Sequence, residues 1–172
     1  MHWGRTVVAV THAPLQGRTY HAVKDAGAFL NGQPITTSRT DRLSEAIVSI
    51  GDYAVGHDAA AYNRHRLALT AELVPRVERI RMVGAATLDL AFVAEGAIDA
   101  RVMMSNKPWD TAAGTLPARE AGAHVTDAHG NPHTDQSAST VATTGAIANE
   151  LATVIQTTNS PNAVQAATAN YF

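Results

Sequence analysis

Short β-branched segments alternate with segments of helical periodicity from residue 46 onward, and this alternation limits the fold more than any other feature of the chain. Strands are expected at 46–50, 79–83, 98–103, 123–126 and 140–144, and helices at 57–74, 85–95, 111–121 and 146–156. Pro75, Gly96 and Gly122 are expected to end the first three of these helices. Because such alternation is typical of layered α/β folds, the sequence predicts a mixed sheet covered by helices.

The segment before residue 46 has a different pattern. Two β-branched runs, at 6–11 and 18–23, flank a turn-rich linker and predict an antiparallel hairpin. A second turn is expected within residues 27–35, because Asn31 and Gly32 form an Asn-Gly pair, which is a strong turn signal. The front of the chain therefore reads as antiparallel, and the rest as alternating α/β.

The composition is that of a globular protein, with 172 residues, 45% hydrophobic and 16% charged. We predict a single domain over residues 1–156 and a loosely held polar tail over 157–172. The net charge of −2 comes with scattered Lys and Arg, so the chain has no basic surface for nucleic acid or for a membrane.

The sequence contains no cysteine, which excludes disulfides and thiol chemistry and fits a reducing compartment. Its first residues do not form a signal peptide, and no apolar run is long enough to span a bilayer. The expected location is the cytoplasm.

The run Lys-Pro-Trp-Asp-Thr-Ala-Ala-Gly at 107–114 reads as a turn followed by a small-residue helix. Asp110 is expected just before the helix that begins at Thr111, where Asp is a favoured N-cap. A carboxylate in this position also suits Mg²⁺, and the two roles are compatible because one oxygen can cap while the other coordinates. Pro108 and Trp109 are expected to shape the turn, with Trp109 packed against the protein.

Gly84, Ala85 and Ala86 begin a predicted helix directly after a predicted strand. Small residues there let backbone N–H groups approach an anionic or hydroxyl-rich ligand, although tight strand–helix packing explains them equally well. Histidines between residues 124 and 133 are better explained as a polar surface loop than as a zinc site. The sequence has no motif of a serine hydrolase, a P-loop NTPase or a Rossmann dehydrogenase.

Several blocks together resemble one family. They are Gly-Ala-Phe-Leu-Asn-Gly at 27–32, Val-Gly-Ala-Ala at 83–86 with the segments 88–91, 93–96 and 98–100, the run 107–114, and the segments 118–122 and 124–127. With the hairpin at 7–22, these blocks look like the inositol monophosphatase superfamily of Mg²⁺-dependent phosphatases, in the same order. The resemblance implies the C-terminal portion of that family's layered α/β sandwich, with the hairpin as a remnant of its first sheet.

In that family two or three Mg²⁺ ions polarise the phosphate, activate a water and stabilise the leaving alkoxide. The ligands are an upstream Glu, an Asp-Pro-Ile/Leu-Asp-Gly-Thr motif and the Asp of the Trp-Asp pair. Only the last has a match here, Asp110, so the resemblance implies an N-terminally truncated member with one surviving Mg²⁺ ligand. An acidic residue that holds inositol hydroxyls in lithium-sensitive members corresponds to Met103, or to Met104 if the loop shifts.

The resemblance also implies a substrate, a phosphorylated polyol or sugar. Gly84, Ala85 and Ala86 would give it backbone contacts, and Asp52 lies where the family's substrate-side loop would be. Asp89 and Asp99 are better explained as a helix-surface residue and a strand-end turn residue.

The absent metal motifs leave several accounts open. The chain is either a phosphatase that works with fewer metals or completes its site from a second subunit, or a non-hydrolytic relative kept for binding or as a scaffold. Alternatively, it is a relative repurposed for another reaction on a polar or cyclic small molecule, or a piece whose start lies upstream. The opening strands would expose sheet edges, so we predict a homodimer or higher oligomer.

Overall fold

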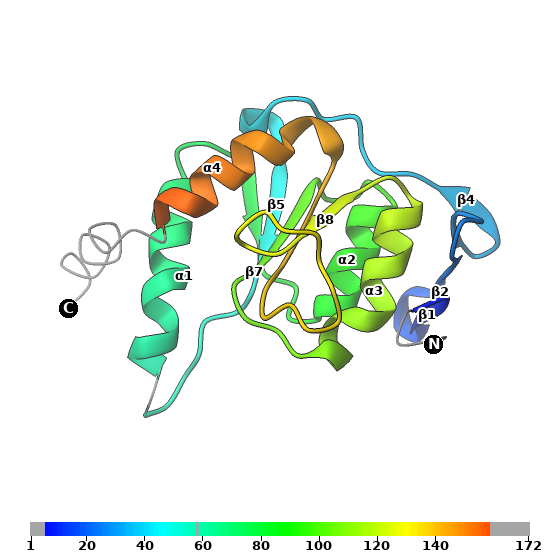
Figure 1. The fold of residues 1–172 in the computed structure, drawn as a ribbon, viewed down its shortest axis with the longest axis horizontal. Coiled ribbons are helices and arrows are strands. Elements are labelled where there is room, and N and C mark those ends of the chain that lie inside the picture. The colour runs from blue at the N-terminus through cyan, green and yellow to red at the C-terminus, as the bar shows by residue number, and fades with distance from the viewer. Residues whose placement is uncertain (1–5, 58, 159–172) are drawn as a thin grey trace.

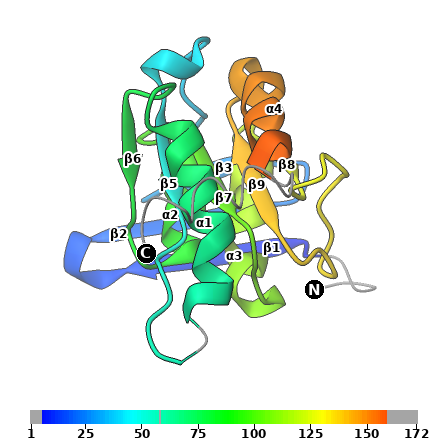
Figure 2. The ribbon, with the colours of Figure 1, turned by 90° about the vertical axis from the view of Figure 1, so that its left-hand side faces the viewer.

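Two sheets and two layers of helices alternate through the molecule (Figures 1 and 2). The computed structural model describes residues 6–57 and 59–158. The small sheet contains β1 (Val8–Ala13), β2 (Arg18–Val23), β3 (Ala28–Leu30) and β4 (Gln33–Ile35), in that spatial order. The large sheet has the spatial order β6 (Arg79–Arg81), β5 (Ile47–Ile50), β7 (Ala100–Met103), β9 (Thr140–Thr143) and β8 (His124–Thr126).

The helices are α1 (Ala59–Leu73), α2 (Ala86–Ala94), α3 (Pro108–Glu120) and α4 (Ala148–Thr158). In the large sheet, β5 is parallel to β6 and β7, whereas β9 is antiparallel to β7 and β8. Helices α1 and α4 cover one face of this sheet, and α2 and α3 lie between its other face and the small sheet (Figure 1). The predicted mixed α/β architecture is confirmed.

The small sheet is built from two hairpins, as the sequence predicts. β1 pairs antiparallel with β2, and β3 pairs antiparallel with β4 across Asn31 and Gly32. Both turn residues have positive φ, 50° and 81°, which is why an Asn-Gly pair suits this position. The side chain of Asn31 accepts a hydrogen bond from Thr19 N at 2.8 Å and donates one to Gly17 O at 2.9 Å, so it ties the two turns together.

Separate apolar clusters fill the spaces between the layers. Between the large sheet and its outer helices, Leu69 of α1 and Leu151 and Ile155 of α4 pack with Val48 and Val102 of the strands. On the other face of the sheet the cluster is smaller, with Leu90, Val93, Ala118 and Ala142. Between the α2–α3 layer and the small sheet the buried residues are mostly alanines, which permit a close approach of helices and strands.

Several element boundaries differ from prediction. α3 begins at Pro108 and not at Thr111, so Trp109 belongs to the helix and its side chain is 75% exposed; the expectation that Trp109 packs against the protein was wrong. Thr157 and Thr158 end α4 and do not belong to a tail, while residues 159–172 of the predicted tail lie outside the described part. No helix in the described part is both long and apolar enough to cross a bilayer, and the cytoplasmic location stays a prediction.

Gly114 determines how closely α3 approaches α2. A Cβ built on Gly114 would lie 2.7 Å from Leu90 Cβ and 3.2 Å from Thr87 O, so nothing larger than hydrogen fits there.

Replacing Gly114 with Ala should therefore force the two helices apart and lower the free energy of unfolding by about 1–3 kcal/mol, the usual cost of overpacking. Chemical denaturation measures this change. Gly51→Ala is the matched control, because a Cβ on Gly51 meets only Arg66 Nε at 3.8 Å. Equal stability of the two variants would contradict the close-packing argument.

Candidate functional site

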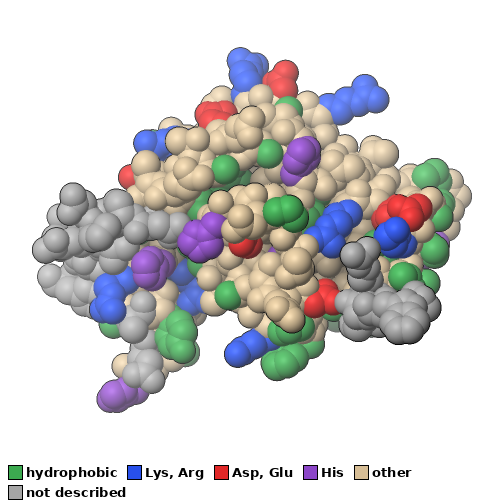
Figure 3. Space-filling model, viewed as in Figure 1, with side chains coloured by type: hydrophobic (Ala, Val, Ile, Leu, Met, Phe, Trp, Pro, Cys, Tyr) green, Lys and Arg blue, Asp and Glu red, His purple; other side chains and the backbone are tan. Residues whose placement is uncertain are grey.

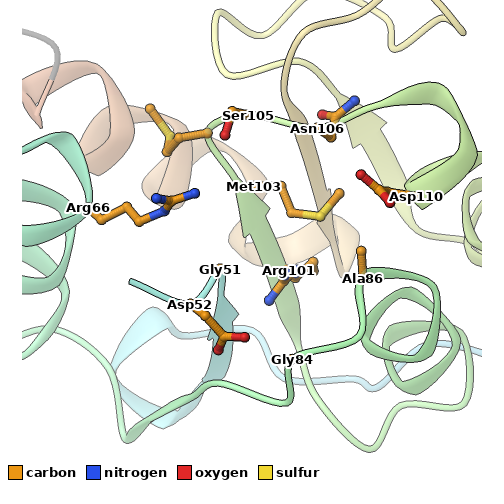
Figure 4. A pocket seen from close by; sticks show the side chains of 11 residues that line it. Gly51, Asp52, Arg66, Gly84, Ala86, Arg101, Met103, Ser105, Asn106 and Asp110 are labelled. Carbon is orange, nitrogen blue, oxygen red and sulfur yellow. The ribbon is translucent and has the colours of Figure 1, made fainter. Parts of the chain in front are cut away.

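A cleft of about 250 Å³ lies at the carboxyl ends of β5 and β7, where α2 and α3 begin (Figure 4). Open α/β sheets place their ligands at this end, because the loops that follow neighbouring parallel strands meet there. The cleft is lined by Gly51, Asp52, Arg66, Gly84, Ala86, Arg101, Met103, Met104, Ser105, Asn106 and Asp110. It brings together several residues that the sequence places far apart.

Asp110 is the third residue of α3 and is half-buried at the cleft. Its Oδ2 accepts a hydrogen bond from Lys107 N at 3.2 Å, so Asp110 caps the helix from inside its first turn and not from the predicted N-cap position. Thr87 Oγ1 donates to Asp110 O at 2.9 Å and fixes the start of α3 against α2. Within the described part of the chain Oδ1 has no hydrogen-bond partner, so one carboxylate oxygen is left for a ligand.

Pro108 occupies the first position of α3, where a missing N–H costs nothing. Together with Trp109 it forms the first turn of the helix, and that turn carries Asp110 to the cleft. The predicted shaping role is thus a helical one, with the indole ring of Trp109 largely in solvent.

Gly84 and Ala86 line the cleft, whereas Ala85 is exposed and is not among its lining residues. Gly84 has a φ of +82°, and a Cβ on it would lie 3.2 Å from Asp52 Oδ2. The positive φ therefore favours glycine at the backbone turn into α2, and a larger residue would crowd the Asp52 carboxylate. Of the predicted site residues, Asp52, Gly84, Ala86 and Asp110 meet in one place.

A buried ion pair lies under the cleft. Arg101 Nη1 of β7 is 2.9 Å from Asp89 Oδ2 of α2, and both side chains are almost fully buried. Ser49 Oγ of β5 donates to Asp89 Oδ1 at 2.5 Å and accepts from Arg101 Nη1 at 2.8 Å. The prediction that Asp89 lies on the helix surface was wrong, because α2 is covered by sheets on both sides.

Burial raises the pKa of the Asp89 carboxyl, and the attraction of Arg101 and the hydrogen bond from Ser49 oppose this rise. Burial likewise lowers the pKa of the Arg101 guanidinium, against the attraction of Asp89 and Asp52. The contact between Asp89 Oδ2 and Arg101 Nη1 is close but not aligned as a hydrogen bond, so Asp89 Oδ2 and Arg101 Nε have no hydrogen-bond partner within the described residues. Asp89 and Arg101 are therefore held together by electrostatic attraction more than by an aligned hydrogen bond.

Asp99 is also more buried than predicted. It lies just before β7, as a strand-end position requires, but its side chain is 6% exposed and accepts hydrogen bonds from Ser38 Oγ and Ile47 N. Its role is structural, because it joins the loop after β4 to the first residue of β5.

Arg66 is a cleft residue that sequence reasoning missed. It extends from α1 into the cleft on the side opposite Asp110 (Figure 4). The only available signal was its spacing, since Arg66 precedes Leu69 and Leu73 by helical intervals and so lies on the side of α1 that faces the protein.

The donor set fits one Mg²⁺ ion that is shared with a phosphate, but not a cluster of metal ions. The described residues contain no group of three or more His, Cys, Asp or Glu side chains that could hold a metal. Mg²⁺ is commonly held by one or two carboxylates together with substrate phosphate and water. Asp110, with its unused oxygen, meets that requirement.

The histidines of the 124–133 segment do not gather into a site. His133 is buried, and its Nε2 lies 2.8 Å from Thr140 Oγ1, so this part of the predicted surface loop lies inside the protein. Burial and the nearby Arg119 lower the pKa of His133. A neutral, hydrogen-bonded imidazole in this position is a structural feature.

Comparison with known proteins gives a consistent result. The family model described as "Inositol monophosphatase family" matches residues 1–160. A fructose-1,6-bisphosphatase/inositol-1-monophosphatase of Thermotoga maritima is 33% identical over 156 residues, which cover 88% of this chain and 56% of the relative. Inositol-1-monophosphatase ImpA of Mycolicibacterium smegmatis is 29% identical over 92% of this chain and 57% of its own length.

A solved structure of a Thermotoga maritima IMPase superposes with a TM-score of 0.82 at 32% identity, over 90% of this chain and 57% of that one. An inositol monophosphatase from Anabaena gives 0.79 at 28% identity, over 91% and 61%. The chain thus spans little more than half the length of the relatives that it matches, and it shares their fold over nearly all of its own length.

Removal of one member of the buried ion pair should be costly. Asp89→Asn keeps the shape and leaves Arg101 as an unpaired buried cation, so we expect a loss of about 3–5 kcal/mol in the free energy of unfolding. Arg101→Met should cost less at pH 5.5 than at pH 7.5, because burial already raises the pKa of Asp89 and the carboxyl can take up a proton instead.

The double variant measures the coupling of the two side chains in chemical denaturation. We expect its loss of stability to be smaller than the sum of the single losses, since no unpaired charge is left behind. Strict additivity would show that the two side chains do not interact.

Proposed function

The chain belongs to the inositol monophosphatase family, and on that premise we propose that it takes part in the Mg²⁺-dependent hydrolysis of a small phosphate monoester of a polyol or sugar. The observation that supports this most is Asp110, which the first turn of α3 holds at the cleft with one carboxylate oxygen unused. The family is generally magnesium-dependent. The names of the relatives support the class of substrate, since they are an inositol and a fructose phosphatase.

In this proposal Asp110 would hold the Mg²⁺ ion at the cleft. A bound Mg²⁺ neutralises phosphate charge and polarises the P–O bonds. Gly84 and Ala86 bring the start of α2 to the cleft, where backbone N–H groups favour an anion or a hydroxyl oxygen. Asp52, on the loop after β5, would accept hydrogen bonds from substrate hydroxyls.

A multi-metal mechanism needs more carboxylates than the described part of this chain brings to the cleft. The proposal therefore assigns Asp110 and the substrate side of the cleft to this chain, with further ligands supplied by a second subunit. The alternative is a non-hydrolytic relative that binds the same class of ligand. It is favoured by the cleft's own lining, in which arginines and methionines outnumber carboxylates.

Phosphate release by the purified chain, from a panel of polyol and sugar monophosphates, tests this function. We expect Mg²⁺-dependent release, and we expect Asp110→Asn to lower its rate by more than about tenfold. Even mutation of residues that only support a metal ligand lowers metal affinity or activity by about 10–100-fold. Asp41→Asn, an exposed change away from the cleft, is the control. Release that is independent of Mg²⁺ or of Asp110, or no release, would retire hydrolysis and leave the binding alternative.

We also propose that the chain self-associates through the outer face of the small sheet. In the described part no strand pairs with the outer edge of β1. The side chains that point away from α3 form this outer face, and it contains no Asp, Glu, Lys or Arg: Val8, Val10, His12, Thr19, His21, Val23, Phe29 and Pro34. The hydrophobic side chains at this end of the molecule are partly visible in Figure 3.

The outer face is apolar and open. Val8 and Val10 are each 56% exposed and Val23 is 42% exposed, while Phe29 stacks on His21 with ring centroids 5.0 Å apart. A largely apolar face without Asp, Glu, Lys or Arg, beside an edge strand rich in β-branched residues, favours association of strands. A second copy of the chain would bury the outer face and pair with the edge of β1. We therefore place the homodimer interface on this surface.

Sedimentation at micromolar concentration tests the dimer. We expect a species of twice the chain mass that Val10→Lys converts to monomer, because a charge on the outer face would be desolvated in the interface. Val55→Lys, at a loop residue that is 95% exposed, should leave the dimer intact. A monomeric unaltered chain would refute this surface.

A further inference from the structure

Arg66 is a half-buried cation that lines the cleft. Within the described residues its guanidinium forms neither an ion pair nor a hydrogen bond. The other arginines that are not exposed are engaged within the described residues: Arg18 with Glu95 and Arg101 with Asp89. A partly desolvated guanidinium gains free energy when it binds an anion, so Arg66 has the unused capacity of a binding group.

The neighbourhood of Arg66 strengthens this argument. Arg101 lines the same cleft at 4% exposure and repels Arg66, and its buried Nε has no hydrogen-bond partner among residues 6–57 and 59–158. Its charge is shared with Asp89 beneath the cleft, whereas that of Arg66 is not. Met103 and Met104 line the same cleft, and their thioethers are only weak hydrogen-bond acceptors for a neutral hydroxyl.

The arrangement across the cleft defines the ligand. Arg66 extends from α1 on one side and Asp110 from α3 on the other (Figure 4). A volume of about 250 Å³ is smaller than the roughly 300–1,000 Å³ of pockets for drug-sized ligands, so a short ligand can contact both sides. A phosphate near Asp110 therefore leaves the far end of such a ligand beside Arg66.

We propose that Arg66 is the specificity-determining residue of the cleft and that it binds a second anionic group of the ligand, a carboxylate or a phosphate. The planar guanidinium recognises either group through paired N–H···O hydrogen bonds. The preferred ligands are accordingly phosphorylated sugar acids or bisphosphates, not neutral polyol monophosphates. This inference rests on the proposed function only for the position of the first phosphate, and not on its hydrolysis.

Calorimetric binding to the full chain in the presence of Mg²⁺ tests the inference with matched probes. Glucitol 6-phosphate and gluconate 6-phosphate differ only in a terminal hydroxymethyl or carboxylate group, and glucitol 1,6-bisphosphate carries a second phosphate instead. We expect the two doubly anionic probes to bind more tightly than glucitol 6-phosphate by roughly 10–100-fold, as hydrogen bonds to charged groups produce. The tighter of the two identifies the second group.

Arg66→Gln should abolish this preference and leave glucitol 6-phosphate binding unchanged within about twofold, a difference too small to reflect a charged hydrogen bond. Arg66→Lys should restore part of it, because the charge returns without the paired geometry. Arg64→Gln, an exposed change on the same helix, is the control, and unfolding curves establish that each variant is folded.

Three results would overturn the inference: no preference in the unaltered chain, an equal loss for all probes in Arg66→Gln, or no binding of any probe. The equal loss would mean that Arg66 contacts the common phosphate or only maintains the cleft. A retained preference without phosphate release in the hydrolysis assay would instead defeat the proposed hydrolysis and leave this inference standing.

Discussion

The contact between Gly114 of α3 and Leu90 of α2 determines the geometry of the helix layer that both sheets share. Because no side chain stands between the helices there, they approach closely, and the hydrogen bond from Thr87 to the carbonyl of Asp110 fixes their relative position. This position places the starts of both helices beside the carboxyl ends of β5 and β7, where the cleft forms. The close packing of α2 and α3 therefore determines both the geometry of the helix layer and the position of the cleft.

Local signals were sufficient to predict most of the elements. The Asn31–Gly32 pair sets positive φ angles whatever the tertiary context, and alternating apolar segments gave the order of strands and helices. The observed start of α3 differs from the prediction because proline suits a turn and the first position of a helix equally well, so Pro108 alone does not distinguish the two. Trp109 was expected to be packed on residue type alone, and type does not determine which side of a helix faces solvent.

Some residues of the site could likewise be predicted from local sequence, whereas others depend on long-range packing. Asp52, Gly84, Ala86 and Asp110 follow strands or begin helices, positions that the order of elements already brings to one edge of a sheet. Asp89 was missed because an acid on a helix is normally solvated, and no local pattern reveals that α2 lies between two sheets. Long-range packing decides such cases. The same packing explains why Arg101, on a strand covered on both faces, needs a partner on that helix.

The charges of the cleft explain how one carboxylate can be useful where relatives of this fold are metal-dependent. A phosphate needs positive charge around it, which metal ions or guanidinium groups can supply. A cluster of several metal ions requires several acidic ligands, whereas an arginine carries its own positive charge and requires only support from neighbouring residues. In the proposed complex Asp110 would supply the metal-binding side and Arg66 the cationic side, while Asp89 and Ser49 hold Arg101 in place beneath the cleft. A ligand with an anionic group at each end is the one that satisfies both.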